Sequence, residues 1–345
     1  MDEQRLRRMV EPLLVWFAQN KRSLPWRADR NPYHVWLSEI MLQQTRVEAV
    51  RDYYIRFLQA APDVFALAAL PEERLLKLWE GLGYYNRARN LQKCARILAE
   101  RGGAFPDTYA QLLQLPGIGA YTAGAIASIC FERPTAAVDG NVLRVCARVL
   151  DDDRPVDTPA YKAALTEALS ACYPPGRCGD FTQSLMELGA TVCVPNGAPR
   201  CEACPIAALC LARERGTAMR RPVKLPKRGK REEERTVFLL HCGDRTAVEK
   251  RPDTGLLAGL WQLPNVTGLL DERQVGDYAA GQGLGDVRLR SARDGKHIFT
   301  HIVWTMRCYT LECTDMPSRF MWVTPEQLRG AVSLPTAFRQ FLDLE

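Results

Sequence analysis

Apolar residues recur at intervals of three and four along most of the first two thirds of the chain. This spacing places them on one face of a helix, and it returns in successive segments to about residue 215. The first example runs through Leu6, Met9, Val10, Leu13, Leu14 and Phe17. The pattern therefore predicts a mainly helical domain over residues 1–215.

The pattern changes after residue 215. Residues 216–233 contain few large apolar side chains, are interrupted by Pro222 and Pro226, and are rich in Lys and Arg, which is typical of a linker. Residues 234–345 contain short β-prone runs separated by Gly, Pro and Asp, and they predict a smaller α+β domain. These runs are Thr236–Leu240, His297–Tyr309 and Phe320–Val323.

Composition and charge indicate a class of binding partner and a cellular compartment. The 345 residues are 47% hydrophobic and carry a net charge of +6, which suits a polyanionic partner without establishing one. The N-terminal segment lacks the uninterrupted apolar core of a signal peptide, and no segment is apolar long enough to span a bilayer. We expect a monomeric intracellular protein that enters no membrane, cytoplasmic and near the nucleoid if the source is bacterial, with its 12 cysteines reduced or bound to metal.

Four of the cysteines lie close together in the sequence, at Cys193, Cys201, Cys204 and Cys210. A structural zinc site usually pairs two CxxC units, whereas here one CxxC is flanked by single cysteines at longer spacings. This arrangement favours four-cysteine iron–sulfur ligation over zinc. Proline, glycine and charged residues around the thiols describe a loop rather than a packed interior, which argues against four unligated core cysteines.

A glycine-rich turn precedes a helix of small residues within Leu115–Ile126. Gly117 and Gly119 would let the backbone approach a DNA phosphate at the positive end of the following helix. A plain turn between helices explains the glycines equally well. Tyr121 follows the turn, and tyrosine has no amine with which to form the Schiff base that a strand-cleaving lyase requires.

Two acidic residues are candidates for catalysis. A pair of carboxyl groups can supply an acid for a leaving group and a negative charge near a developing cation. Glu39 lies among mostly apolar helical neighbours, which would raise its pKa, and Asp139 precedes a helical pattern, where it should stay ionised. Spacing alone favours non-catalytic roles, with Glu39 an exposed helix residue and Asp139 an ordinary N-cap.

Several segments together resemble the MutY-type adenine DNA glycosylases of the helix-hairpin-helix, or endonuclease III, superfamily. They are WLSEIMLQQTRV, LPGIG followed by YTAGAI, VDGNVLRV and the cysteine loop. The resemblance implies a mainly α glycosylase domain with a [4Fe–4S] loop held by the four cysteines, although seven residues rather than the usual six separate the first two. It implies that Glu39 protonates adenine at N7, that Asp139 stabilises or transiently traps the sugar cation, and that Tyr121 and Asn141 assist.

The same resemblance implies how DNA is held. The partner would be double-stranded DNA containing adenine opposite 8-oxoguanine or guanine, with the adenine flipped out of the helix. The implied base-binding residues are Trp26, Arg27, Leu42 and Gln183. The implied DNA-binding residues are Gln43, Gln44, Thr45, Tyr84, Gly117 and Gly119, with Gln44 and Tyr84 as wedges; core packing also explains Tyr84 and Tyr121.

The last third resembles the Nudix-like C-terminal domain of the same family. The resemblance rests on Thr254–Pro264 and on Phe299, Thr300 and His301, which would recognise 8-oxoguanine. Thr300 replaces the usual serine and Gln262 a common glutamate. The sequence lacks the glutamate-rich helix that holds Mg²⁺ in Nudix hydrolases, and we interpret Arg231–Glu234 as a solvated linker that precedes the first strand.

Two other functions remain open. One is an endonuclease III-like enzyme for oxidised pyrimidines, against which Tyr121 and the second domain argue. The other is a non-catalytic DNA-binding protein with a redox-sensing cluster, against which the presence of both Glu39 and Asp139 argues. We predict an adenine glycosylase with little lyase activity.

Overall fold

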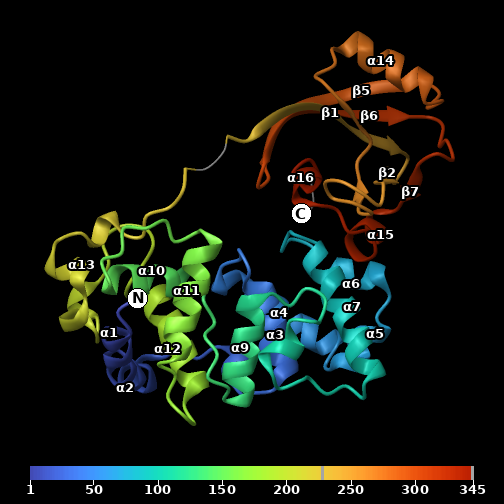
Figure 1. Ribbon diagram of the computed structural model, residues 1–345. Coiled ribbons are helices and arrows are strands. Elements are labelled where there is room, and N and C mark those ends of the chain that lie inside the picture. The colour runs from blue at the N-terminus through green and yellow to red at the C-terminus, as the bar shows by residue number, and fades with distance from the viewer. Residues whose placement is uncertain (227–228, 343–345) are drawn as a thin grey trace. The chain divides into compact units, whose positions relative to one another are not determined.

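The computed structural model describes residues 1–226 and 229–342, and the chain divides into two compact units (Figure 1). The helical unit contains Met1–Ala69 and Arg89–Pro226, and the sheet unit contains Leu70–Ala88 and Lys227–Glu345. The short segment Leu70–Ala88 therefore belongs with the C-terminal third of the chain. Among the described residues, no helix is both long enough and apolar enough to cross a bilayer.

The helical unit is built from α-helices and short 3-10 turns. Its longer helices are α2 (Val10–Asn20), α3 (Pro32–Leu42), α4 (Val47–Ala60), α7 (Asn86–Glu100), α9 (Ala120–Phe131), α10 (Gly140–Val149), α11 (Pro159–Ser170) and α12 (Cys178–Thr191). The shorter elements are α1 (Glu3–Arg8), η1 (Pro25–Arg27), α5 (Val64–Ala69), α8 (Tyr109–Leu112), η2 (Cys201–Ala203), η3 (Ala207–Leu209), α13 (Leu211–Glu214) and η4 (Ala218–Arg220).

Local sequence explains where the helices of the site begin. Asn31 caps α3 by accepting a hydrogen bond from the Tyr33 amide, and Pro32 occupies the first turn, where its missing N–H costs nothing. Asp139 caps α10 by accepting from the Val142 amide. These caps fix the starting points of the helices that carry the two candidate carboxylates.

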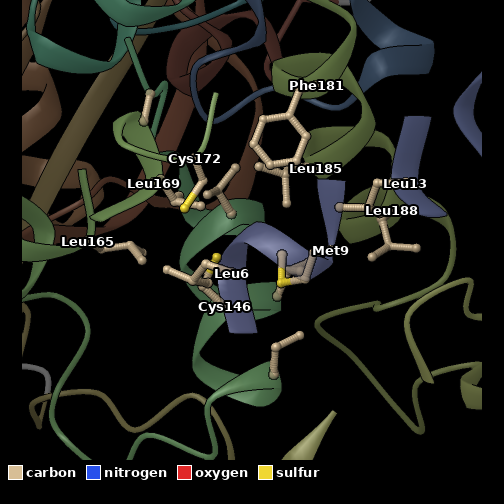
Figure 2. Close-up of a cluster of buried hydrophobic side chains, with 14 of the residues drawn as sticks. Leu6, Met9, Leu13, Cys146, Leu165, Leu169, Cys172, Phe181, Leu185 and Leu188 are labelled. Carbon is tan, nitrogen blue, oxygen red and sulfur yellow. The ribbon is translucent and has the colours of Figure 1, made fainter. Parts of the chain in front are cut away.

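The N-terminal helices pack against α10, α11 and α12. Figure 2 shows their buried side chains converging in one apolar cluster. Leu6 lies in α1, Leu13 lies in α2 and Met9 lies between the two helices. All three contact residues that lie more than 130 positions further along the chain. The other labelled members are Cys146, Leu165, Leu169, Cys172, Phe181, Leu185 and Leu188. This core holds α10 and α12 side by side.

The sheet unit contains a mixed sheet with strand order β3-β2-β1-β6-β5, with β4 paired to β1 and β7 to β2. β1 and β6 are parallel, and the other pairs are antiparallel. The strands are β1 (Arg231–Cys242), β2 (Arg245–Lys250), β3 (Trp261–Gln262), β4 (Asn265–Thr267), β5 (Val287–Ile298), β6 (Ile302–Cys313) and β7 (Met321–Val323); the helices are α6 (Glu72–Leu78), α14 (Glu272–Gly281), α15 (Pro325–Gly330) and α16 (Thr336–Arg339).

Alternating side chains of β1 and β6 face opposite sides of the sheet, as the strand period requires. On one side they pack against α14 and on the other against α15 and α16 (Figure 1). The first cluster includes Phe238, Leu240, Tyr309 and Leu311 with Val275 and Ala279; the second includes Val237, Leu239, Trp304 and Met306 with Leu328 and Phe338. The α+β character predicted for the last third is therefore confirmed.

Two predictions about the strands were wrong. Arg231–Glu234 lies inside β1, because its backbone pairs in register with β6 from Arg231 opposite Ile302 onward. The run His297–Tyr309 is divided by a turn into the end of β5 and the start of β6. The first error arises because β6, a strand distant in sequence, decides where β1 begins. The second arises because the turn Phe299–His301 contains no glycine or proline to mark it.

Candidate active site and cysteine cavity

The helical unit contains a pocket of about 740 Å³ whose wall carries all of the predicted catalytic and base-binding residues. Helices α3, α9, α10 and α12 contribute to this wall, together with η1. The predicted residues that line it are Trp26, Arg27, Glu39, Leu42, Gln43, Gln44, Thr45, Tyr121, Asp139, Asn141 and Gln183. These residues span about 150 positions of sequence, and the fold brings them to one cavity.

Glu39 lies in the last turns of α3 and is buried, with 6% of its surface exposed. Burial raises the pKa of Glu39 to about 7, and the nearby Asp139 charge acts in the same direction. The hydrogen bond from Tyr121 and the Arg27 charge act against this rise. Glu39 therefore has the proton affinity that a general acid needs near neutral pH.

Tyr121 lies in the first turn of α9, and its hydroxyl donates a hydrogen bond to Oε2 of Glu39. The same hydroxyl lies 3.9 Å from Sδ of Met186 on α12. Burial raises the pKa of Tyr121 well above its ordinary value, and the neighbouring carboxylates add to this effect. Tyr121 therefore remains a proton donor to Glu39 over the working pH range.

Asp139 is the N-cap of α10. One carboxylate oxygen accepts from the Val142 amide at 2.7 Å, and the other accepts from Nδ2 of Asn141 at 2.6 Å. Asn141 is held in turn by Nη2 of Arg144, which donates to its Oδ1 at 2.8 Å. Burial nevertheless raises the pKa of Asp139, and this effect opposes the ionised state that was expected of an aspartate at a helix N-terminus.

A buried carboxylate that was not predicted from sequence pairs with two arginines on the pocket wall. Glu187 on α12 is fully buried and accepts from Nε of Arg22 at 2.7 Å and from Nη2 of Arg27 at 2.8 Å. Its position four residues after Gln183 places both on one face of α12, and this spacing was the available signal. Glu187 fixes the guanidinium of Arg27 on the pocket wall.

The two predicted wedge residues share an unusual backbone conformation. Gln44 has φ of 58° and Tyr84 has φ of 49°, a left-handed region that residues other than glycine rarely adopt. Such conformations concentrate at functional sites, where the surrounding structure holds them in place. Gln44 lines the pocket of the helical unit, whereas Tyr84 lies in the sheet unit and is 48% exposed.

The glycine turn lies outside the pocket wall. Gly117 has φ of +75°, and a Cβ there would lie 2.7 Å from Cβ of Asn90. Both the backbone conformation and the lack of space for a side chain therefore favour glycine at this position. Gly119 is the N-cap of α9, and a Cβ there would meet open space. The predicted turn before a helix is therefore present.

The four clustered cysteines line a second, smaller cavity between α10, α12 and the loop that follows α12. Burial raises the pKa values of Cys204 and Cys210, and the other cluster thiols act in the same direction. The longer spacing after Cys193 includes the exposed Gly197, with φ of +76°, and Cys193 lines the same cavity as the others.

The donor set fits a thiolate-bound metal centre in its chemistry, since four thiols line one cavity. Nη1 of Arg148 lies 3.2 Å from Sγ of Cys193 and would offset negative charge on the sulfur. Within the described part of the chain, no group of three or more His, Cys, Asp and Glu side chains is already placed to hold a metal ion.

The predicted lesion-recognition residues lie in the sheet unit, at the turn between β5 and β6. Phe299 is partly buried, whereas Thr300 and His301 are exposed. The Thr300 hydroxyl lies 2.7 Å from the hydroxyl of Tyr84, within the same unit. Gln262 is buried and donates to Oε1 of Glu249 at 2.7 Å, so it has a structural partner within the sheet.

Comparison with known families agrees with both parts of the fold. Residues 37–169 match the HhH-GPD superfamily base excision DNA repair protein family, and residues 236–344 match the NUDIX domain family. Among solved structures, a thermostable thymine-DNA glycosylase is 30% identical with a TM-score of 0.55, covering 61% of this chain and 98% of that chain. A non-covalent endonuclease III–DNA complex, 24% identical with a TM-score of 0.53, covers 63% of this chain and 98% of its own and shares the fold.

Similarity to curated proteins extends over almost the whole chain. The adenine DNA glycosylase of Mus musculus is 36% identical over 96% of this chain and 77% of the mouse protein. The adenine DNA glycosylase of Homo sapiens is 36% identical over 95% of this chain and 72% of the human protein. On this evidence, together with a helical unit and a Nudix-like unit in one chain, the protein belongs to the adenine DNA glycosylase family.

Proposed function

We propose that this protein removes adenine from double-stranded DNA in which the adenine is paired with 8-oxoguanine or guanine. Membership of the adenine DNA glycosylase family supports adenine as the base that is removed. The single observation that carries the chemistry is the pocket that brings a carboxyl group with a pKa of about 7, Glu39, together with a capped carboxylate, Asp139. The pocket receives the adenine after it is flipped out of the duplex.

In this proposal Glu39 is the general acid. Its proton passes to N7 of the adenine, and the electron pair of the glycosidic bond leaves with the base. Arg27, held by Glu187, and Trp26, Leu42 and Gln183 form the wall against which the base lies. A base held in one orientation presents the same nitrogen to Glu39 in every turnover.

Asp139 balances the positive charge that remains on the sugar. Its negative charge lies in a buried site, where an electrostatic interaction is stronger than in water. Asn141 and the Val142 amide keep the carboxylate oriented. A water molecule then adds to the sugar cation, and its released proton returns to Glu39, so the enzyme is regenerated.

The proposal includes base removal without efficient strand cleavage. Tyr121 supplies a hydroxyl to Glu39 at a position where related lyases carry lysine. The pocket wall does contain a lysine, Lys162 on α11. Any residual strand scission is therefore expected to depend on Lys162, and Lys162→Met is the control for it.

We also propose that Cys193, Cys201, Cys204 and Cys210 hold a [4Fe–4S] cluster. A bound cluster would join four points of the loop after α12 covalently and would so stiffen it. Arg148 and Arg144 tie this loop to α10, since Nε of Arg144 donates to the Cys193 carbonyl at 2.7 Å. The loop is therefore positioned by α10, the helix that Asp139 caps.

The test compares duplexes under single-turnover conditions. Adenine opposite 8-oxoguanine and adenine opposite guanine should both lose the base, and the strand should remain intact until alkali is added. An oxidised pyrimidine duplex should be left unchanged. Release of the pyrimidine with strand scission would instead support an endonuclease III-like enzyme, and tight binding without release would support a DNA-binding protein.

A further inference from the structure

The turn Phe299–His301 joins two long strands of the sheet unit. The Phe299 amide donates to the carbonyl of Ile302 at 2.8 Å, which closes the turn. Thr300 and His301 at its tip are exposed, although the Thr300 hydroxyl already lies 2.7 Å from that of Tyr84. Such a turn recognises a base only if its backbone is held in one position, because an error of about 1 Å breaks hydrogen bonds to the ligand.

Residues at the start of β1 hold this turn from the side. Nζ of Lys230 donates to the carbonyl of Phe299 at 2.7 Å, and the Arg231 amide donates to the carbonyl of His301 at 2.9 Å. The two carbonyls flank Thr300. Lys230 and Arg231, which were predicted to belong to the linker, therefore hold the backbone of the turn in place.

A second contact acts through an aromatic ring. Phe299 packs edge-on against Trp304, with ring centroids 4.9 Å apart. Trp304 is fully buried, and its Nε1 donates to Oε2 of Glu233 at 2.9 Å. The guanidinium of Arg235 lies over the same ring at 4.4 Å. Glu233 therefore fixes the orientation of the ring that supports Phe299.

We propose that Lys230 and Glu233 are positioning residues for the recognition of 8-oxoguanine by the turn Phe299–His301. The inference rests on the proposed function and adds residues to it. Neither side chain needs to touch the lesion, because one holds the backbone of the turn and the other holds the aromatic support beneath it. Their loss lowers discrimination between 8-oxoguanine and guanine and leaves the base-release step in the helical unit unchanged.

The test measures binding to two duplexes in which the adenine nucleotide carries a 2′-fluorine, which opposes formation of the sugar cation and so blocks cleavage. The ratio of Kd for the guanine duplex to that for the 8-oxoguanine duplex reports discrimination. Lys230→Met should lower this ratio about tenfold, the effect of losing one charge-assisted hydrogen bond. Glu233→Ala should lower it by at least as much, because this carboxylate also pairs with Arg231 and Arg235. Glu233→Gln keeps an acceptor for Trp304 and should stay near wild type.

Glu232→Ala is the matched control, because Glu232 is the exposed neighbour on the same strand. Hydrogen–deuterium exchange of the DNA-free protein over residues 297–304 should rise in Glu233→Ala and not in this control. Trp304→Phe, which keeps a ring and removes the N–H donor, provides a second variant if Glu233→Ala does not fold; it should lower the ratio likewise.

The inference would be overturned if Lys230→Met and Glu233→Ala (or Trp304→Phe in its place) discriminated between the two duplexes as well as the wild type does. It would also be overturned if the variants bound both duplexes equally more weakly. Adenine release from unmodified substrate at saturating enzyme is measured in parallel. If the wild type released no adenine, the proposed function would fail. If it released adenine and the variants kept full discrimination, only this inference would fail.

Discussion

Glu39 and Asp139 are buried carboxyl groups on the wall of one pocket, but their hydrogen-bond partners differ. Glu39 accepts from the hydroxyl of Tyr121, and burial raises its pKa to about 7. Asp139 accepts from a backbone amide and a side-chain amide, both of which favour the ionised form. The difference suits one group that gives a proton and another that supplies charge.

The first prediction concerns pH. Glu39 acts in its protonated form, so the single-turnover rate of adenine release should be highest below about pH 7 and should fall tenfold per unit above it. The Tyr121 hydrogen bond lowers the pKa of Glu39. Tyr121→Phe should therefore move the alkaline limb of the pH–rate profile upward. A limb that stays in place or moves downward would contradict the assignment.

The second prediction separates the two roles of Asp139. Asparagine caps a helix about as well as aspartate, whereas alanine costs about 1 kcal/mol of the free energy of unfolding. Asp139→Asn should therefore unfold at nearly the wild-type urea concentration, and Asp139→Ala should unfold earlier. Both should slow adenine release by about 100-fold or more, because both lose the charge. An active Asp139→Asn would show that only the cap matters.

Sequence alone indicated that apolar neighbours would raise the pKa of Glu39, because those neighbours lie within two helical turns. It could not reveal the ion pairs of Glu187 with Arg22 and Arg27, since 165 and 160 residues separate the partners. The same holds for the bond between Tyr84 and Thr300, which are 216 residues apart. Local patterns predict burial within an element, but only the fold specifies such distant partners.

Helices were predicted better than strands. Caps such as Asn31 and Asp139 are encoded next to the helices that they begin. The strand β1 instead begins at Arg231, within a polar and charged stretch, because parallel pairing with β6 extends that far. Strand β5 was largely missed for a related reason: as an edge strand it has mostly exposed side chains and little apolar alternation.

The third prediction concerns the loop after α12. The purified protein should contain about four iron atoms per chain and no zinc, as four-cysteine ligation of a [4Fe–4S] cluster requires. Cys204→Ser should lower the iron content and the thermal unfolding temperature, because metal binding contributes directly to folding. Metal analysis and calorimetry measure the two effects. A stoichiometric zinc content would show that the spacing of the cysteines was misinterpreted.

At the scale of the whole molecule, each unit carries one part of the proposed recognition. In the proposal, the pocket of the helical unit receives the adenine and the turn Phe299–His301 of the sheet unit contacts the opposite base. The basic stretch Arg220–Arg231 connects them, and residues 227–228 of it lie outside the described residues. Arg220 and Lys224 are exposed, and their charge suits contact with DNA phosphates.

The fourth prediction tests that connecting stretch. Arg220→Ala combined with Lys224→Ala should reduce the slope of log K against log salt by about 0.9 for each phosphate that the protein no longer neutralises. Leu225→Ala removes an exposed uncharged side chain from the same stretch and should leave the slope unchanged. An identical slope in all three proteins would mean that this stretch does not bind DNA.

The most direct test of the account is single-turnover release of adenine from a duplex with adenine opposite 8-oxoguanine, comparing wild type with Glu39→Gln. The wild type should release adenine and leave the strand intact before alkali, and Glu39→Gln should bind the duplex but release adenine at least about 100-fold more slowly. Release by Glu39→Gln at the wild-type rate, or tight binding without release by the wild type, would contradict the assignment of Glu39 as the acid.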